Sequence, residues 1–281
     1  MEPEPIDFET ERGLVLMGDA LGPEHGPLIL LLHGGGQTRQ SWAETQVQLA
    51  ARGFRALALD QRGHGEASWS KSGAYGLESY AADIAAVARL IGTPPVALVG
   101  ASLGGMASML ALGEKMLPGT PALVLVDVVH RPEAEGASHI RTFMSSASDG
   151  FDNLEAAADA VAAYLPHRER PRRLDGLRRN LREREGRWYW HWDPAFMRYR
   201  DADTGTRFDL ERVAAAAARL EGPVMLVRGE RSEIVSEDLA REFQALVPHA
   251  DLAVVPGASH MVSGDSNDAF VAAIMKFLRK A

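Results

Sequence analysis

The stretch Val99-Gly100-Ala101-Ser102-Leu103-Gly104-Gly105 decides the fold, because one serine stands between glycines where an apolar run meets a helical pattern. It matches Gly-x-Ser-x-Gly, a strained strand-to-helix turn that lifts the serine hydroxyl above the edge of a sheet. Small flanking residues let the backbone pass close to its neighbours. We therefore expect Ser102 to be a nucleophile at a helix N-terminus, where backbone N–H groups favour developing negative charge. The alternative is a serine that only caps its helix.

Working outward, short apolar runs alternate with helical patterns along the chain. Continuous runs, unlike alternating ones, are typical of strands buried on both faces of a parallel sheet. The runs are Leu28–Leu32, Ala56–Leu59, Val96–Val99, Ala122–Val126, Val224–Val227 and Leu252–Val255. Apolar residues at three- and four-residue spacing predict helices over Tyr80–Ile91, Leu239–Leu246 and Ala269–Leu278. This rhythm predicts an α/β fold with a mostly parallel central sheet flanked by helices.

The rhythm breaks between residues 131 and 219, where the sequence is helical, arginine-rich and aromatic and no strand is predicted. We therefore expect a core built from residues 1–130 and 220–281, with 131–219 inserted as a helical cap. The segment 167–187 is locally basic. Arginines on both sides of glutamates favour a solvated, ion-paired helix face, and the alternative is recruitment of an anionic substrate or partner.

Composition restricts the classes of function. The 281 residues carry a formal net charge of −8, whereas nucleic acid or an anionic membrane requires a basic surface. The absence of cysteine excludes disulfides and thiolate nucleophiles. The acidic start has no basic n-region or apolar h-region, and no apolar stretch approaches the roughly 20 residues of a membrane helix. We expect a cytoplasmic monomer or homodimer that acts on a small molecule. Without His-x-x-x-His or acidic ligand spacing, no metal site is predicted.

A serine nucleophile requires a base and groups that stabilise the oxyanion. His260 follows the last predicted strand, so it lies at the same sheet edge as Ser102 and is the best candidate for the general base. The loop His33-Gly-Gly-Gly36 follows the strand at 28–32 and can turn backbone N–H groups toward a substrate. We expect the N–H groups of Gly35 and Leu103 to form the oxyanion hole. His33 is interpreted as structural, and a plain tight turn is the alternative for the glycines.

The segment 188–192 contains three tryptophans and a tyrosine in five positions. Such side chains combine a large apolar area with polar tips, suited either to fixing the cap on the core or to lining a pocket above Ser102. The predicted substrate-binding residues are Trp190, Trp192, Phe143 and Met144. If they line the pocket, the acyl or leaving group is apolar or aromatic and of modest size.

Together these motifs resemble the α/β-hydrolase superfamily from about Gly13 to Leu278. The resemblance also includes Asp60-Gln-Arg-Gly-His-Gly-Glu66, Pro-Gly-Ala-Ser-His260 and Leu-Val-Leu-Val-Asp127. It is strongest to capped bacterial hydrolases grouped with epoxide hydrolases, non-haem haloperoxidases and carbon–carbon bond hydrolases. It implies a Ser–Asp/Glu–His triad in that chain order, an active site under the cap and no cofactor. Because the elbow carries serine and not aspartate, epoxide hydrolase and haloalkane dehalogenase chemistry is not expected.

The acid of the triad departs from the family pattern. The usual aspartate falls at Ser232, which cannot hold an imidazolium electrostatically. We therefore expect the neighbouring Glu233 to replace it, with Asp127 as the alternative because some family members supply the acid from that strand end. Glu230, or no acid at all, remains open. Asp60 is expected to be structural, as a cap or paired with Arg62.

These residues predict a cofactor-independent serine hydrolase that cleaves a small ester, lactone or thioester through an acyl-enzyme on Ser102, with His260 as base and Glu233 as acid. A carbon–carbon bond hydrolase or a perhydrolase could use the same triad. Outside enzymes, the alternative is a non-catalytic ligand-binding protein on this fold.

Overall fold

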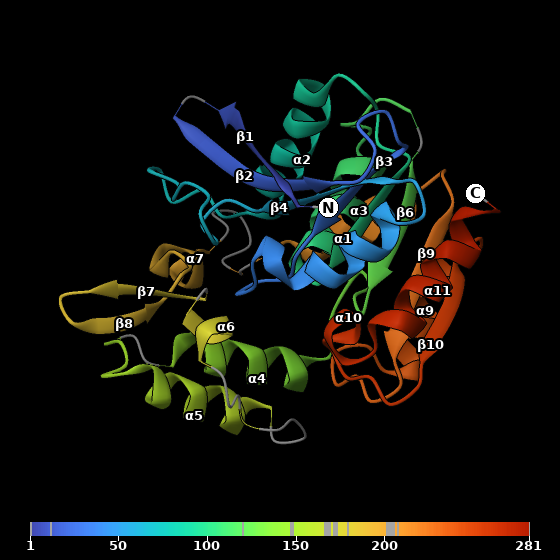
Figure 1. The fold of residues 1–281 in the computed structure, drawn as a ribbon. Helices are drawn as coiled ribbons and strands as arrows, with labels where there is room; N and C mark the ends of the chain where they lie inside the picture. Colours follow the sequence, from blue (N-terminus) through green and yellow to red (C-terminus); the bar gives the residue numbers. More distant parts are fainter. Residues whose placement is uncertain are drawn as a thin grey trace.

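The computed structural model describes residues 2–11, 13–119, 121–146, 149–165, 170, 174–178, 180–200, 206 and 208–280. At its centre lies an eight-stranded sheet with strand order β1-β2-β4-β3-β5-β6-β9-β10 (Figure 1). The strands span β1 Glu4–Glu11, β2 Leu14–Leu21, β3 Leu28–Leu32, β4 Arg55–Asp60, β5 Ala97–Ala101, β6 Ala122–Val126, β9 Val224–Gly229 and β10 Asp251–Val255. From β4 to β10 in this order all neighbours are parallel, so the predicted α/β class is confirmed.

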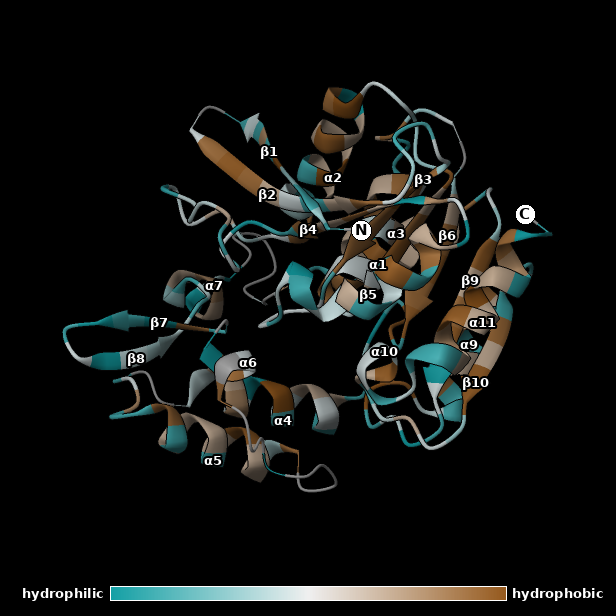
Figure 2. Ribbon diagram, in the orientation of Figure 1, coloured by the Kyte–Doolittle hydropathy of each residue, from teal (hydrophilic) through white to brown (hydrophobic). Residues whose placement is uncertain are grey.

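Helices cover both faces of this sheet. One face packs on α2 (Leu77–Ile91), α3 (Leu103–Gly113), α8 (Leu210–Ala217) and α9 (Glu237–Leu246), and the other on the 3-10 turn η1 (Arg39–Trp42), α1 (Ala43–Ala50), α10 (Val262–Asp265) and α11 (Asn267–Leu278). In β3 the side chains alternate between the two resulting cores: Leu30 packs into the first and Ile29 into the second. Both faces are therefore apolar, which explains the continuous runs in the sequence (Figure 2). The edge strand β10 differs from the inner strands and exposes Leu252 and Val254.

The first two strands, β1 and β2, were not predicted from the sequence. β1 and β2 form an antiparallel hairpin, with Glu4 opposite Ala20, and β2 also pairs antiparallel with β4. In β1 most side chains are exposed or half-buried and Phe8 is buried. Because an edge strand with one wet face carries acidic residues between apolar ones, it lacks the continuous run that identified the inner strands.

The cap elements lie together on one side of the core (Figure 1). They are α4 Ala134–Ser145, α5 Leu154–Tyr164, α6 Asp175–Arg178, β7 Leu181–Arg184, β8 Arg187–Trp190 and α7 Pro194–Arg198. The expectation of no strand here is wrong, because β7 and β8 form a hairpin. Its two-residue turn, Glu185-Gly186, has positive φ at both positions (51° and 76°), as a type I′ hairpin turn requires.

The division into core and cap stays a prediction. The helix α8 falls inside the segment 131–219, yet it packs against α3, and a methyl group added at Gly113 would lie 2.1 Å from the carbonyl oxygen of Ala216. Of the basic segment 167–187, residues 167–169, 171–173 and 179 lie outside the described residues. None of the described helices combines the length and the apolar character that crossing a membrane requires.

Candidate active site

Ser102 lies at the junction between β5 and α3 with φ 43° and ψ −110°, a conformation that L-residues rarely adopt. The flanking glycines are required by close contacts. A methyl group at Gly100 would lie 2.6 Å from the backbone of Gly105, and one at Gly104 would lie 2.5 Å from the carbonyl oxygen of Leu32. The strained turn expected from the Gly-x-Ser-x-Gly motif is therefore present.

His260 lies in the loop between β10 and α10, at the carboxyl edge of the sheet where Ser102 follows β5. Its Nδ1 is 2.9 Å from Oδ2 of Asp127, which follows β6. Asp127 is fully buried, whereas the His260 side chain is 21% exposed. Since a carboxylate accepts hydrogen bonds, Nδ1–H donates and Nε2 keeps its lone pair. This tautomer is the one in which an imidazole can take a proton from a nucleophile.

Three donors surround the Asp127 carboxylate. Besides His260, the backbone N–H of Gly229 donates to Oδ1 at 2.9 Å and the hydroxyl of Ser232 donates to Oδ2 at 2.5 Å. Asp127 itself has φ 50°, so its backbone is in the left-handed region. Ser232, the position where the family pattern places an aspartate, thus donates its hydroxyl to the Asp127 carboxylate.

The expectation that Glu233 supplies the acid does not fit this geometry. The Glu233 side chain is 72% exposed, and its Oε2 lies 3.7 Å from Nδ1 of His139 on α4. The loop after β9 turns so that Ser232 points to Asp127, and the next side chain points away from it. The alternative that the sequence analysis left open, Asp127, occupies the position beside His260. Glu230 accepts a hydrogen bond from the backbone of Gly257 and also does not reach His260 Nδ1 through any described contact.

The glycine loop after β3 forms a tight turn beside the nucleophile. The N–H of Gln37 donates to the carbonyl of Gly34 at 3.1 Å, and Gly36, with φ 76°, occupies the third position, as in a type II turn. A methyl group at Gly34 would lie 3.3 Å from Cβ of Ser102. The loop that contains Gly35 and the start of α3, where Leu103 lies, are therefore neighbours, as an oxyanion hole requires.

His33 fixes this loop. Its ring is fully buried, Nε2 accepts from the N–H of Gln61 at 3.1 Å, and Nδ1–H donates to the carbonyl of Gly34 at 2.8 Å. Burial lowers the pKa of His33, so the ring stays neutral and keeps this pair of hydrogen bonds. The residue has the structural position expected from the sequence.

Two ion pairs below the loop differ from the expected one. Asp60 was expected to be structural, which fits, but it pairs with the Arg39 guanidinium and not with Arg62. Arg62 instead binds Asp83 on α2, with Nε–Oδ2 and Nη2–Oδ1 distances of 2.6 and 2.8 Å. Arg39 lies in η1, after the loop that follows β3, and Arg62 lies in the loop after β4. Which carboxylate each arginine meets depends on the fold and not on the local sequence.

Three cap side chains cover the glycine loop. A methyl group at Gly36 would lie 2.9 Å from Cε of Met144 and 3.3 Å from the Trp192 ring, and one at Gly35 would lie 3.4 Å from the Phe196 ring. Met144 and Trp192 were among the predicted substrate-binding residues. The sequence analysis missed Phe196, because a single phenylalanine in a short helix has no distinguishing pattern.

The other two predicted residues pack inside the cap. Trp190 stacks on Trp192 with ring centroids 5.0 Å apart, and Phe143 lies 5.3 Å from Trp190 and stacks on Tyr164 at 4.1 Å. Trp190 is buried and Phe143 is half-buried. The aromatic segment therefore contributes both to cohesion of the cap and, through Trp192, to the wall above the glycine loop.

His191 ties the cap to the core. Its Nδ1 accepts from the N–H of Gly65 at 2.7 Å, so Nε2 carries the proton and faces the carbonyl of Gly36 at 3.3 Å. Burial, with a smaller effect of His33, lowers its pKa to about 3. A second contact between the cap and the core is the hydrogen bond that the Tyr75 hydroxyl donates to Asp193 at 2.5 Å. The neutral His191 thus connects the glycine loop directly to the cap hairpin.

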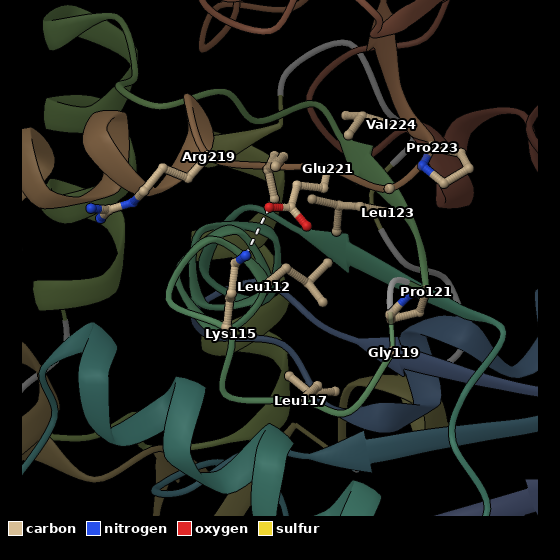
Figure 3. A pocket seen from close by; sticks show the side chains of 12 residues that line it. Leu112, Lys115, Leu117, Gly119, Pro121, Leu123, Arg219, Glu221, Pro223 and Val224 are labelled. Carbon is tan, nitrogen blue, oxygen red and sulfur yellow. Dashed lines mark hydrogen bonds and ion pairs between the residues drawn. The ribbon is translucent and has the colours of Figure 1, made fainter.

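A cavity of about 240 Å³ lies away from these residues, at the amino ends of β6 and β9 (Figure 3). Its lining includes Leu123 and Val224, and the ion pair between Lys115 and Glu221 (2.8 Å) lies in its wall. It contains none of the predicted site residues. Among the residues that the structure describes, no three His, Asp or Glu side chains gather where they could hold a metal ion.

The chain is similar to known hydrolases along most of its length. A family model described as the alpha/beta hydrolase fold matches residues 27–266. Over 267 residues the chain is 30% identical to 2-(acetamidomethylene)succinate hydrolase of Mesorhizobium japonicum, covering 90% of this chain and 88% of that protein. Over 253 residues it is 29% identical to esterase Rv0045c of Mycobacterium tuberculosis, covering 87% and 80%.

Solved structures agree with the sequence relatives. The crystal structure of E-2-(acetamidomethylene)succinate hydrolase superposes with a TM-score of 0.82 at 27% identity and covers 99% of both chains. A structure of the Mycobacterium tuberculosis esterase superposes with a TM-score of 0.75 at 26% identity and covers 99% of this chain and 93% of that one. The similarity therefore extends over nearly the whole chain.

Proposed function

Because the chain belongs to the alpha/beta hydrolase fold family and is a hydrolase like its named relatives, we propose that it cleaves a small ester, lactone or thioester through an acyl-enzyme on Ser102. The nucleophile, base and acid are Ser102, His260 and Asp127. No cofactor takes part in the proposed steps. The observation that carries the proposal is the hydrogen bond from His260 to the buried Asp127, at the sheet edge where the strained elbow presents Ser102.

In the first half-reaction, Nε2 of His260 takes the proton of the Ser102 hydroxyl while Oγ attacks the substrate carbonyl. The imidazolium that forms is held by Asp127, whose carboxylate keeps the ring in the required orientation. The tetrahedral intermediate then collapses: the bond to the leaving group breaks and His260 returns the proton to that group. The acyl group stays on Ser102 as an ester.

In the second half-reaction, water gives its proton to His260 and its oxygen attacks the acyl carbon. The second tetrahedral intermediate releases the carboxylic acid, and Ser102 regains its proton. In both intermediates the N–H groups of Gly35 and Leu103 donate to the oxyanion. Since the first N–H groups of a helix have no acceptor within the helix, the N-terminus of α3 is suited to this task.

The walls over the glycine loop support an apolar acyl or leaving group of modest size. Met144, Trp192 and Phe196 contact the positions of Gly35 and Gly36. Trp190 stacks on Trp192, and Phe143 packs against Trp190, so both rings help to hold Trp192 in this wall. A group attached to the reacting carbonyl would therefore meet thioether and aromatic surfaces.

Turnover of a series of 4-nitrophenyl esters tests this function against carbon–carbon bond hydrolysis. We expect saturable hydrolysis of the esters by the wild-type chain, loss of that activity in Ser102→Ala, and little turnover of vinylogous diketones. If the folded wild-type chain hydrolyses no ester, lactone or thioester above the Ser102→Ala background, the proposal is wrong. Preference for diketones over esters would replace it with carbon–carbon bond hydrolysis.

A further inference from the structure

A hollow of about 260 Å³ lies in the cap between α4 and α7, and its lining of described residues is Arg141, Ser145, Met197 and Arg200. Two of the segments that line it also contain residues that cover the glycine loop. Arg141 and Ser145 are one turn apart on α4 and flank Met144, which covers Gly36. On the other side Met197 follows Phe196, which covers Gly35. The lining of the hollow and the residues that cover the glycine loop therefore come from the same two segments of the chain.

Neither arginine lining this hollow pairs with an acid among the described residues, whereas Arg131 and Arg212 do. Arg131 binds Glu242, and Arg212 binds Glu114 with two hydrogen bonds of 2.7 and 2.8 Å. In the part of the chain that the structure describes, no carboxylate lies within 4.0 Å of the Arg141 or Arg200 guanidinium. Two positive charges therefore share one concave site without a described counter-ion, in a chain whose net charge is −8.

One of the two guanidinium groups is held in place by the backbone. Nη1 of Arg200 donates to the carbonyls of Tyr199 at 2.6 Å and Met197 at 3.3 Å. A guanidinium has five N–H donors in a planar fork, so these bonds leave Nε and Nη2 for another acceptor. The Ser145 hydroxyl adds one more donor at the opposite wall. This set of donors matches a carboxylate, which arginine binds through two parallel hydrogen bonds.

We propose that this hollow is a subsite for a carboxylate on the substrate, and that Arg141 and Arg200 bind it. The inference rests on the proposed function: the ester of the substrate lies at Ser102, and the carboxylate at the other end of the same molecule binds in the hollow. It narrows the substrate class to esters of dicarboxylic acids or esters with an acidic leaving group. The apolar stretch of such a molecule would pass Met144 and Phe196, which cover the glycine loop.

Two matched substrates test the inference. The mono-4-nitrophenyl ester of adipic acid has a carboxylate at the far end, and 4-nitrophenyl heptanoate is its neutral counterpart of the same length. We expect the wild-type chain to prefer the adipate ester in kcat/KM. The double variant Arg141→Gln/Arg200→Gln should lose about 10- to 100-fold of that preference, the range of one or two hydrogen bonds to a charged group. Hydrolysis of the heptanoate should change by no more than about twofold.

The control variant is Arg198→Gln, which removes an exposed arginine at the end of α7, two residues before Arg200 and outside the lining of the hollow. If it reduces the preference as much as the double variant does, the effect is a general loss of positive charge and the subsite is wrong. An unchanged preference in the double variant also contradicts the subsite. If neither ester is hydrolysed, the proposed function fails instead.

Calorimetric titration of adipate into the Ser102→Ala chain gives a readout without turnover. We expect adipate to bind to this chain and to lose about tenfold or more in affinity when Arg141 and Arg200 are also replaced by Gln. Circular dichroism spectra establish that the triple variant is folded. Absence of adipate binding to the Ser102→Ala chain, or equal binding to both chains, overturns the inference whatever the esterase assays give.

Discussion

Nδ1 of His260 lies 2.9 Å from Oδ2 of Asp127, a residue separated from it by 133 positions in the chain. The contact forms because β6 and β9 are neighbours and β9 pairs with β10, so the loops after β6 and β10 meet at one sheet edge. Gly229, at the end of β9, lies between them: a methyl group there would be 2.3 Å from the carbonyl oxygen of Ser259. The geometry therefore places Asp127 beside His260, and Glu233 near His139 instead.

We predict that Asp127→Asn reduces kcat by about 10³- to 10⁴-fold, because an amide nitrogen in place of Oδ2 cannot accept from Nδ1–H and the ring takes the wrong tautomer. Glu233→Gln should change kcat by less than about twofold, since its exposed carboxylate contacts only His139 among the described residues. Ester hydrolysis by the two variants at equal concentration measures this. A large loss in Glu233→Gln with an active Asp127→Asn would reverse the assignment.

The Ser232 hydroxyl lies 2.5 Å from the Asp127 carboxylate, so the two positions can share one role. We expect Asp127→Asn/Ser232→Asp to recover about 10-fold or more of the activity lost in Asp127→Asn, because the new carboxylate can orient the imidazole. Ser232→Asn in the same background is the control, of similar size but without the charge. No difference between the two double variants would show that position 232 cannot take the acid's role.

The burial of His191 predicts a dependence of stability on pH. The folded-state pKa of about 3 is below the ordinary value of 6.5, so below pH 6.5 the unfolded chain binds a proton that the folded chain does not. The free energy of unfolding should therefore decrease as the pH falls from 6.5 toward 3. Between pH 7 and 5 the contribution of this residue is about 2 kcal/mol.

Urea unfolding at pH 7 and pH 5 measures the effect of His191. His191→Gln removes the titrating ring, so its free energy of unfolding should fall between these pH values by about 2 kcal/mol less than that of the wild-type chain. His25→Gln, at an exposed position, should keep the wild-type pH dependence. Equal pH dependence in all three chains would refute the account of His191.

Gly36 and Gly73 form a matched pair for the contact between the glycine loop and the cap. Both have positive φ (76° and 70°), but a methyl group at Gly36 would meet Met144 at 2.9 Å, whereas none of the described residues lies within 4 Å of one at Gly73. Gly73→Ala should cost about 1 to 2 kcal/mol from backbone strain alone. Gly36→Ala should cost about 1 to 3 kcal/mol more from overpacking and also reduce kcat.

Unfolding in urea and ester hydrolysis measure these two variants side by side. Met144→Ala combined with Gly36→Ala should restore part of the activity, because the methyl group then has space. If Gly36→Ala is no worse than Gly73→Ala in stability and in kcat, the cap does not press on the glycine loop as the structure indicates.

The inner parallel strands β3, β4, β5, β6 and β9 were predictable from the sequence because both of their faces are buried. Leu28–Leu32 and Ala122–Val126 coincide with β3 and β6. Strands with a polar face were not: β1 alternates acidic and apolar residues, and β7 carries Arg182, Glu183 and Arg184. These strands are stabilised by pairing with a neighbouring strand. The local sequence of one strand does not show which strand it pairs with.

Within the site, the local motifs were predictable and the long-range contacts were not. The elbow at Ser102 depends on glycines next to it in sequence, and the expected strained conformation is present. The partner of His260 depends on how the loop after β9 turns, which directs Ser232 toward Asp127 and Glu233 outward. The same reason explains why Arg62 meets Asp83 and not Asp60.

The most direct measurement for the central claim is labelling with a fluorophosphonate, followed by intact mass spectrometry and peptide mapping. We predict one adduct per wild-type chain, on Ser102, no adduct on Ser102→Ala, and labelling at least about 100-fold slower in Asp127→Asn. A folded wild-type chain that remains unlabelled, or that carries the adduct on another residue, would contradict the claim that Ser102 is an activated nucleophile.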